Sequence, residues 1–252
     1  MAPILWMQTK IVKFLMKNII FEDEQIIVAY KPAGIATQTA RVGQQDMVSE
    51  IKNYLNKKNK AAGKPVSEPY VGLVHRLDQP VCGLIVFAKT KTAAAALSHQ
   101  INNGEFQKYY YAIVLGKPSK DTDVLVDYIY KDGHNNQSYI VDETFPEAKK
   151  AVLEYRTVRT LVALEENLEA TLLEIHLMTG RHHQIRAQLS HANMPILGDG
   201  KYGSMESKDF SKDSACKNVA LCAHKIRFKH PMTGEELTFE RDPDDEIFEA
   251  FL

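Results

Sequence analysis

The stretch Val71–Thr90, VGLVHRLDQPVCGLIVFAKT, decides how this chain is expected to fold. Its first aliphatic residues and the run from Gly83 to Ala88 are both typical of short, buried strands. The charged connection between them ends at Pro80, which has no N–H to offer a neighbouring strand. We therefore expect Asp78, inside this connection, to be held rigidly where a strand meets a turn.

A carboxylate in that setting has two interpretations. Asp78 could accept hydrogen bonds from its own main chain and so stabilise the turn, which is common for aspartate. It could instead be a nucleophile or a base. The second interpretation needs partner residues from elsewhere in the chain.

The composition is that of a globular protein. The chain has 252 residues, of which 44% are hydrophobic and 25% charged, enough for one large core or two small ones. The formal net charge is −1, so an anionic partner such as a nucleic acid would have to meet a local basic patch. Basic residues do cluster, in three groups: Lys52, Lys57, Lys58, Lys60 and Lys64; Arg181 and Arg186; and Lys225, Arg227 and Lys229. A solvated helix end is the ordinary explanation for the first group.

Cysteine usage and the N-terminal segment indicate a cytoplasmic setting. The three cysteines are far apart and form no CxxC pair, which is typical of a reducing compartment. Lysines interrupt the apolar residues 1–18, so we expect neither a signal peptide nor a membrane span there. We treat residues 1–18 as an extension before the domain, with Met16 as an alternative first residue.

Hydrophobic periodicity predicts alternating helices and strands after this segment. Helices are expected over residues 46–58, with Asp46 as the N-cap, over 91–102, and from Gly180 to about Ala192. Strands are expected over 21–30, 107–115, 149–159, 168–177, 221–229 and 236–239, with weaker signals within 122–142, whereas 204–217 gives no clear signal. The predicted fold is a single α+β domain over residues 19–252, built on a mixed, mainly antiparallel sheet flanked by helices.

A second charged centre lies in MTGRHHQIRAQ, residues Met178–Gln188. If the helix begins near Gly180, its first N–H groups suit a phosphate or carboxylate, and His182 and Arg186 share one stripe. An arginine rooted on a packed helix can fork onto a carboxylate. Exposed surface arginines are the ordinary alternative.

Other chemistries have less support. The histidines and cysteines lack the spacing of a zinc site, and there is no GxSxG motif for a serine nucleophile. Gly198, Gly200 and Gly203 lack the lysine and hydroxyl residue of a phosphate-binding loop, so a turn is expected. The aromatic strand with Tyr109, Tyr110 and Tyr111 could supply a ring for stacking on a base, although packing is the commoner role of strand tyrosines.

Taken together, these residues resemble the RluA-type family of pseudouridine synthases. His75-Arg76-Leu77-Asp78 followed by Gly83 is similar to the HRLD signature of that family, and Lys108 with Tyr110-Tyr111-Ala112 and Gly116 resembles its tyrosine strand. Gly180-Arg181-His182-His183-Gln184-Ile185-Arg186 resembles its arginine helix. The following loop and two shorter matches also fit, at Pro195, Gly198, Asp199, Tyr202, Gly203, Lys31-Pro32-Ala33-Gly34 and Leu221-Cys222-Ala223-His224.

The resemblance implies isomerisation of uridine to pseudouridine in ribosomal or transfer RNA, without a metal or organic cofactor. Asp78 would be the catalytic carboxylate, Tyr110 would stack on the flipped base, and Arg186 would pair with Asp78 and hold it ionised. Arg76 would fill the space that the extruded uridine leaves, which helps to offset the lost stacking. Further substrate contacts are expected from His75, Arg181, His183, Gln184 and Lys31, and the protein is expected to be a monomer.

The sequence departs from the family pattern at two places. Val81-Cys82 stands where the family usually has Thr-Ser, and His182 stands between Arg181 and His183 where threonine is more usual. The small N-terminal RNA-binding domain of many relatives is also expected to be absent. Two other functions therefore stay open: an RNA-binding protein without catalysis on the same fold, and a nucleoside glycosidase, which would need a second acid near Asp78.

Overall fold

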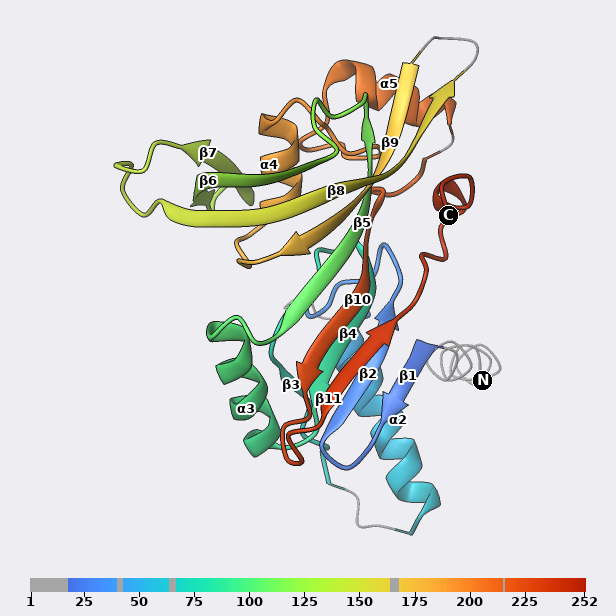
Figure 1. The fold of residues 1–252 in the computed structure, drawn as a ribbon. Coiled ribbons are helices and arrows are strands. Elements are labelled where there is room, and N and C mark those ends of the chain that lie inside the picture. The colour runs from blue at the N-terminus through green and yellow to red at the C-terminus, as the bar shows by residue number, and fades with distance from the viewer. Residues whose placement is uncertain (1–17, 40–42, 64–66, 164–167, 215) are drawn as a thin grey trace. The chain divides into compact units, whose positions relative to one another are not determined.

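The computed structural model describes residues 18–39, 43–63, 67–163, 168–214 and 216–252. The chain forms two compact units. The first consists of residues up to Phe106 and of Arg227–Phe239, and the second of Gln107–Ile226 and Glu240–Leu252 (Figure 1). One catalytic domain over residues 19–252 stays a prediction.

The first unit contains a sheet in which β2 lies between β1 and β4. All neighbours are antiparallel, and β3 also pairs with β4. The prediction of one strand over residues 21–30 is wrong, because Asp23 turns the chain: its Oδ1 accepts hydrogen bonds from the N–H groups of Gln25 at 2.7 Å and Ile26 at 2.8 Å. The strands are β1 (Ile19–Glu22), β2 (Ile26–Lys31), β3 (Gly72–Leu73) and β4 (Cys82–Ala88).

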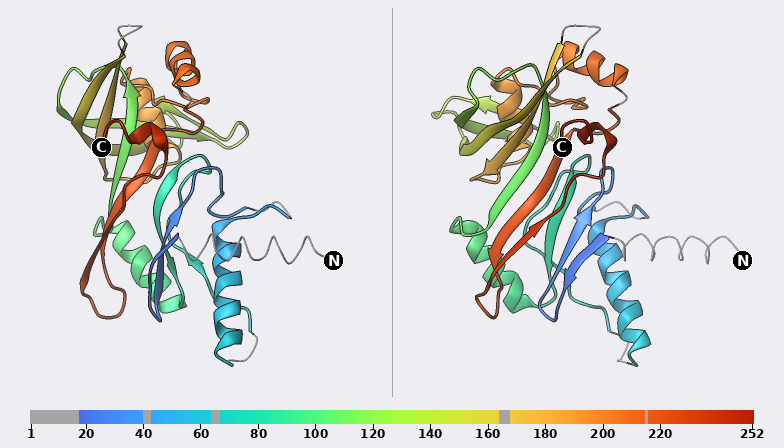
Figure 2. Two further views of the ribbon diagram at one scale, coloured as in Figure 1. Left: turned by 90° about the vertical axis from the view of Figure 1, so that its right-hand side faces the viewer. Right: turned by 45° about the vertical axis from the view of Figure 1, so that its right-hand side comes forward.

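Helix α2 (Met47–Ala61) covers one face of β2 and β4. It begins where the sequence predicts, because Asp46 Oδ1 accepts a hydrogen bond from the Ser49 N–H at 2.7 Å. Figure 2 shows α2 alongside β1 and β2. Burying a large apolar side chain contributes roughly 1.5–3 kcal/mol, so this cluster is a main source of stability in the first unit. Its buried members are Ile27, Ala29, Met47, Val48, Ile51, Leu55, Ile85 and Phe87.

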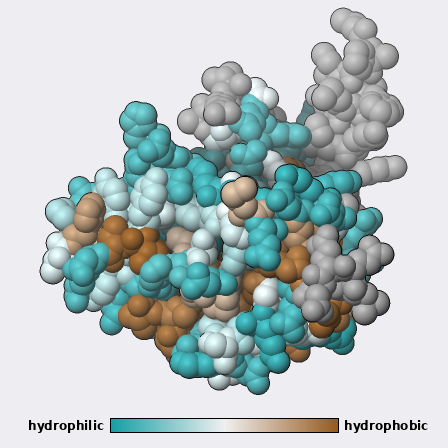
Figure 3. Space-filling view, turned by 90° about the horizontal axis from the view of Figure 1, so that it is seen from above, coloured by the Kyte–Doolittle hydropathy of each residue, from teal (hydrophilic) through white to brown (hydrophobic). Residues whose placement is uncertain are grey.

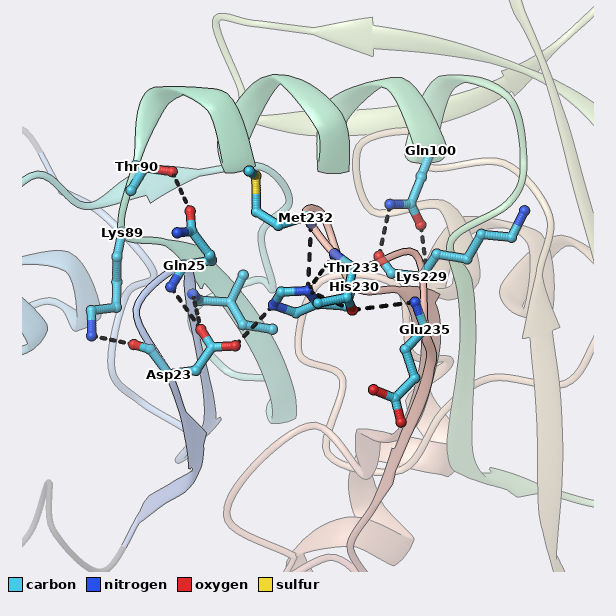
Figure 4. Close-up of polar contacts among 11 residues, drawn as sticks. Asp23, Gln25, Lys89, Thr90, Gln100, Lys229, His230, Met232, Thr233 and Glu235 are labelled. Carbon is cyan, nitrogen blue, oxygen red and sulfur yellow. Dashed lines mark hydrogen bonds and ion pairs between the residues drawn. The ribbon is translucent and has the colours of Figure 1, made fainter.

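The segment Arg227–Phe239 returns to the first unit late in the chain, and hydrogen bonds from helix α3 (Lys91–Asn102) and from His230 join it to the rest of that unit (Figure 4). Gln100 of α3 exchanges two hydrogen bonds with the main chain of Lys229, at 2.8 and 2.9 Å. His230 Nδ1 accepts from the Thr233 N–H at 3.1 Å, so Nε2 carries the proton and donates to Asp23 Oδ2 at 2.8 Å. No sequence pattern predicted this connection.

The second unit contains the longer strands. Their order is β5-β9-β8-β6-β7, and all neighbours are antiparallel. The predicted strands over 107–115 and 168–177 are confirmed. The strands are β5 (Gln107–Leu115), β6 (Thr122–Asp132), β7 (Gln137–Val141), β8 (Lys149–Ala163) and β9 (Leu168–Leu177).

Helix α4 (Gln184–His191) packs against β6 and β7, and α5 (Met205–Asp213) follows it. The stretch without a sequence signal forms α5. Its buried positions are Ser207 and Ser211 rather than apolar residues, which explains why hydrophobic periodicity did not predict a helix there. The chain ends with β10 (Leu221–Lys229), β11 (Glu236–Glu240) and the short helix η1 (Glu246–Phe248).

The face seen in Figure 3 is mostly hydrophilic, with separate hydrophobic patches. The second unit exposes several large apolar side chains, among them Val124, Val126, Phe145 and Val162. Within the described residues, no helix is both long enough and apolar enough to cross a membrane.

Candidate active site

Asp78 lies in the connection between β3 and β4, and both of its neighbours are fastened by hydrogen bonds. The N–H of Leu77 donates to Thr37 Oγ1 at 3.1 Å, and that hydroxyl donates to the Leu77 carbonyl at 2.8 Å. On the other side, the Gln79 carbonyl accepts from the Gly34 N–H at 2.8 Å. Asp78 is itself half-exposed, and its own carbonyl accepts from the Val81 N–H at 3.1 Å, which closes the turn. The main chain on either side of Asp78 is therefore held in place.

Lys31 of β2 holds the same connection through its side chain. Its side chain is fully buried, with 0% exposure. The ammonium donates to the carbonyls of Pro32 at 3.0 Å, Ile35 at 2.7 Å and Gln79 at 3.1 Å. An ammonium has three hydrogens, so these contacts use its donors. Lys31 holds the turn 32–35 and the Asp78 connection together, while its contact with substrate stays a prediction.

The two other basic residues of this connection differ in their surroundings. Arg76 is exposed. His75 is half-buried: its Nε2 accepts a hydrogen bond from the Val86 N–H at 3.1 Å, and its ring lies against Phe106 with centroids 5.2 Å apart. His75 therefore ties the connection to β4. The predicted RNA contacts of Arg76 and His75 stay predictions.

Arg186 of α4 forms a buried, two-pronged ion pair. Its Nε lies 2.7 Å from Asp199 Oδ2 and its Nη2 lies 2.8 Å from Oδ1. The ring of Tyr202 lies 5.0 Å from the guanidinium carbon. Arg186 is only 6% exposed and Asp199 only 2%. The sequence predicted an arginine that forks onto a carboxylate, and the structure adds Asp199 as a partner.

The charge of Asp199 is well stabilised. Burial raises its pKa, but the Arg186 guanidinium and the N–H groups of Tyr202 and Lys201 outweigh that effect, so the pKa lies below its ordinary value. Those N–H groups donate to Oδ1 at 3.0 and 2.9 Å. Both the loop after α4 and the helix itself thus fix the ion pair.

The residues just before α4 are joined to β7 by a small network. The Tyr202 hydroxyl accepts from the Ser138 N–H at 2.7 Å and lies 2.8 Å from His183 Nδ1. Ser138 Oγ lies 2.9 Å from His182 Nδ1 and donates to the His182 carbonyl at 2.6 Å. The two histidine rings stack with centroids 3.7 Å apart. His182, which departs from the family pattern, therefore packs on His183 and contacts β7.

The predicted start of this helix at Gly180 is wrong. Helix α4 begins at Gln184, because His183 has a left-handed main chain with φ of 51° and interrupts the helical path. His182 therefore lies in a turn and shares no helical stripe with Arg186. The Arg181 N–H donates to Gln184 Oε1 at 2.9 Å, so a side chain rather than an anion satisfies it.

Gln184 and Arg181, both predicted substrate contacts, have protein partners in this structure. The Gln184 oxygen accepts from Thr179 Oγ1 and from Arg181, and its nitrogen donates to the Val152 carbonyl and to Gln188 Oε1. Arg181 Nε donates to the Lys150 carbonyl at 2.9 Å. Arg181 is exposed, whereas Gln184 is buried. Their contacts with RNA, like that of His183, stay predictions.

Alternation along β5 separates its three tyrosines. Tyr110 is 6% exposed and faces the buried side of the strand. Tyr109 and Tyr111 face the other side, where they stack on His176 and His224 with centroids 4.7 and 3.7 Å apart. Of the three, only Tyr110 shares a face with Lys108.

Metal ligands and reactive thiols are not evident in the described part of the chain. No three His, Cys, Asp or Glu side chains there lie close enough to hold a metal ion, and the three cysteines form no disulfide. Burial raises the pKa of Cys216 to about 11, so this thiol stays protonated at neutral pH.

The structure thus gives two settings for the predicted catalytic residues. Asp78 belongs to the first unit, and Tyr110 and Arg186 belong to the second. Their action on one substrate stays a prediction. Sequence analysis assigned no role to Asp199, Tyr202 or Thr37. One signal could have pointed to Asp199: it lies between two glycines just after the arginine helix.

The fold is shared with solved pseudouridine synthases. Over 97% of this chain and 95% of the other, it superimposes on human RNA Pseudouridylate Synthase Domain Containing 4 with a TM-score of 0.71 at 23% identity. At that identity the likeness establishes the α+β fold class that the sequence predicted.

Sequence comparison defines the family. Residues 25–191 match the family RNA pseudouridylate synthase. The chain is 33% identical to ribosomal large subunit pseudouridine synthase D of Zymomonas mobilis, over 89% of this chain and 68% of that protein. It is 32% identical to the protein of the same name in Vibrio cholerae, over 93% and 70%. The chain therefore belongs to the RNA pseudouridylate synthase family and is an RNA pseudouridine synthase, as the HRLD and arginine segments predicted.

Proposed function

We propose that this enzyme converts specific uridines of structured RNA to pseudouridine with Asp78 as its catalytic carboxylate. Large-subunit ribosomal RNA is the first substrate to test, because the two relatives described above carry that target in their names. Transfer RNA is the second. Action in the cytoplasm, as a monomer, belongs to the same proposal.

The reaction is an isomerisation and needs no redox partner. The bond between N1 of uracil and C1′ of ribose breaks, the base turns, and C5 bonds to C1′. N1 gains a proton and C5 loses one, so atoms and electrons balance within the nucleotide. Asp78 attacks or assists at the ribose, and Tyr110 stacks on the freed uracil.

The fastening of the Asp78 connection is the observation that carries this proposal. Leu77 is fixed by Thr37, and Gln79 is fixed by Gly34 and Lys31, so the main chain that carries the carboxylate has a defined position. A group held rigidly in one geometry loses little entropy when the reaction begins, which favours catalysis. Arg186 is similarly rigid, because Asp199 grips two of its nitrogens. In this proposal Arg186 keeps Asp78 ionised.

Arg76 and His75 flank the same carboxylate in sequence and have distinct roles in the proposal. Arg76 is exposed and free to move into the space that the flipped uridine leaves. His75, His183 and Arg181 add polar contacts to the RNA. Lys31 and Gln184 act mainly by holding the connection and the arginine loop in place.

Asp78→Asn tests the carboxylate. The variant keeps the shape of the side chain but cannot act as a nucleophile or base, so we expect pseudouridine formation to fall by a factor of at least 10³, on the order of the losses seen when an essential catalytic group is removed. The substrate is an unmodified transcript of large-subunit ribosomal RNA, and pseudouridine is mapped by carbodiimide adducts that stop reverse transcription. Asp213→Asn, which changes an exposed aspartate of α5, is the matched control and should keep full activity. An active Asp78→Asn enzyme would refute the role of Asp78.

A further inference from the structure

Lys108 stands on β5 two residues before Tyr110. The register pairs Tyr109 with His176 and Tyr110 with Ile175, so the strand alternation places the side chains of Lys108 and Tyr110 on the same face. Lys108 is half-buried there. A Cβ added to Gly180 would lie 3.4 Å from the Nζ of Lys108. The ammonium therefore lies beside the start of the arginine loop, in contact distance of a residue that has no side chain.

Cations of the arginine segment and of the loop after it have protein partners among the described residues, whereas the Lys108 ammonium has none there. Arg181 donates to the Lys150 carbonyl, Arg186 is paired with Asp199, and Lys201 donates to the Asn136 carbonyl at 2.8 Å. Across the described ranges of the chain, neither a hydrogen bond nor an ion pair reaches Lys108 Nζ. The contrast with Lys31 is direct, since that buried ammonium donates to three carbonyls.

An unpartnered ammonium in a half-buried position is unfavourable. Burial lowers the pKa of Lys108, because the charged form loses part of its hydration. Lysines of this kind are retained where a ligand supplies the missing negative charge. The ligand of this family is RNA, and its phosphate groups are the anions that the lysine would meet.

We propose that Lys108 binds a backbone phosphate adjacent to the target uridine, while Tyr110 contacts the uracil of the same nucleotide. The inference rests on the proposed function, from which it takes the position of the uracil at Tyr110. Alternate residues on one strand face are about 6.6 Å apart, a spacing of the size of a single nucleotide. A Cβ at position 180 would lie in ordinary van der Waals contact with the ammonium, so Gly180 places the arginine segment beside Lys108 with no side chain between them. Lys108 thus positions the nucleotide by its charge, without reading the base.

The first test compares Lys108→Met with Lys108→Arg in binding to RNA. The probe is a synthetic stem-loop that carries a uridine modified by the wild-type enzyme, and its dissociation constant is measured over a range of salt concentrations. Loss of one phosphate contact should weaken binding by roughly tenfold or more and reduce the slope of log K against log salt by about 0.7 to 1. Lys108→Arg should keep most of the slope. Lys117→Met, which removes an exposed lysine just after the same strand, should change neither quantity.

The second test removes the charge from the RNA instead. Methylphosphonate linkages are placed one at a time on either side of the uridine. At one position the neutral linkage should weaken binding of the wild-type enzyme and have no further effect on Lys108→Met, because both changes delete the same contact. Equal losses in both proteins at every position would overturn the proposal.

Folding and activity controls separate the possible failures. Because the ammonium bonds to no residue that the structure describes, Lys108→Met should melt at the same temperature as the wild type or higher, whereas a structural ion pair would make it melt lower. If the wild type forms pseudouridine but Lys108→Met keeps its affinity and salt slope, the phosphate contact is refuted and the proposed function stands. If the wild type forms no pseudouridine on any of these RNAs, the proposed function falls, and with it the assignment of the phosphate next to a target uridine.

Discussion

The connection around Asp78 and the loop around Arg186 hold their charged groups by different means. In the first, the fixed atoms are those of the main chain, because Thr37 bonds to the N–H and carbonyl of Leu77 and Lys31 bonds to the carbonyl of Gln79. In the second, Asp199 grips the functional side chain itself. The Asp78 carboxylate is therefore positioned through its backbone, whereas the Arg186 guanidinium is positioned directly.

This difference predicts different sensitivities to mutation. A backbone anchor can be weakened while the functional side chain keeps its own chemistry, so its loss should affect both stability and the placement of Asp78. A buried ion pair depends on both partners, since removing one leaves an uncompensated charge. The substitutions below separate the two kinds of support, beginning with the one that should cost most.

Asp199→Ala should be the most damaging of these changes. It leaves the Arg186 guanidinium buried without its carboxylate, which typically costs about 3–5 kcal/mol of the free energy of unfolding. Urea denaturation followed by circular dichroism measures that loss. Asp209→Asn breaks an exposed pair with Lys212 and should change stability by less than about 0.5 kcal/mol. If Asp199→Ala is as stable as this control, the two-pronged ion pair does not support the loop.

Lys31→Met should have the next largest effect. It removes a donor from three carbonyls, of which that of Gln79 keeps the Gly34 N–H and those of Pro32 and Ile35 belong to half-buried residues. A buried acceptor left without a partner costs about 1–3 kcal/mol, so we expect a total loss of about 2–3 kcal/mol. At a temperature where the variant is folded, activity should also fall, because the Gln79 carbonyl then keeps only the Gly34 N–H as its donor. The control is Lys52→Met, which removes an exposed pair with Glu68. Equal stability of the two variants would contradict the anchoring role of Lys31.

The strands and most helices could be predicted because their signals are local. Alternation over 107–115 and 168–177 gave β5 and β9, and Asp46 marked the start of α2. Helix α5 escaped prediction because its buried side is made of Ser207 and Ser211, which carry no hydrophobic periodicity. The start of α4 was misplaced because the left-handed conformation of His183 depends on neighbours such as Tyr202, not on local propensity.

The sequence predicted which residues belong to the candidate site, but not which contacts hold them. The arginine loop showed where Arg186 would be, but the position of Asp199 follows from a turn whose glycines are needed for long-range reasons. A Cβ on Gly198 would lie 1.8 Å from the Asn218 carbonyl oxygen, and one on Gly203 would lie 2.4 Å from the Asp199 carbonyl oxygen. Neither approach can be read from spacing. The expected turn at these glycines is confirmed, and its reason is steric.

Thr37→Val should have a smaller effect than either charged substitution. The valine keeps the volume of threonine but loses a hydroxyl that both accepts from and donates to the main chain of Leu77, so a cost of about 1–2 kcal/mol of the free energy of unfolding is expected. Thr37→Ser keeps the hydroxyl and should lie close to the wild type. The useful quantity is the turnover number at a temperature where both variants are fully folded. Lower turnover for valine than for serine would show that the hydroxyl positions the Asp78 connection, and equal turnover would show that Thr37 only adds stability.

The smallest effect is the dependence of the Asp199 ion pair on pH. Because the pKa of Asp199 in the folded protein lies below its ordinary value of 3.8, its contribution to stability is fully present above that value and is lost as the pH falls through the folded pKa. Asp199→Asn cannot ionise, so the difference in the free energy of unfolding between wild type and variant should be constant near neutral pH and shrink only below 3.8. Urea denaturation of both proteins across this range measures the difference. A difference that already declines well above 3.8 would mean that Arg186 does not stabilise the ionised carboxylate. In that case the two supports would be alike, with the loop held by its main chain just as the Asp78 connection is.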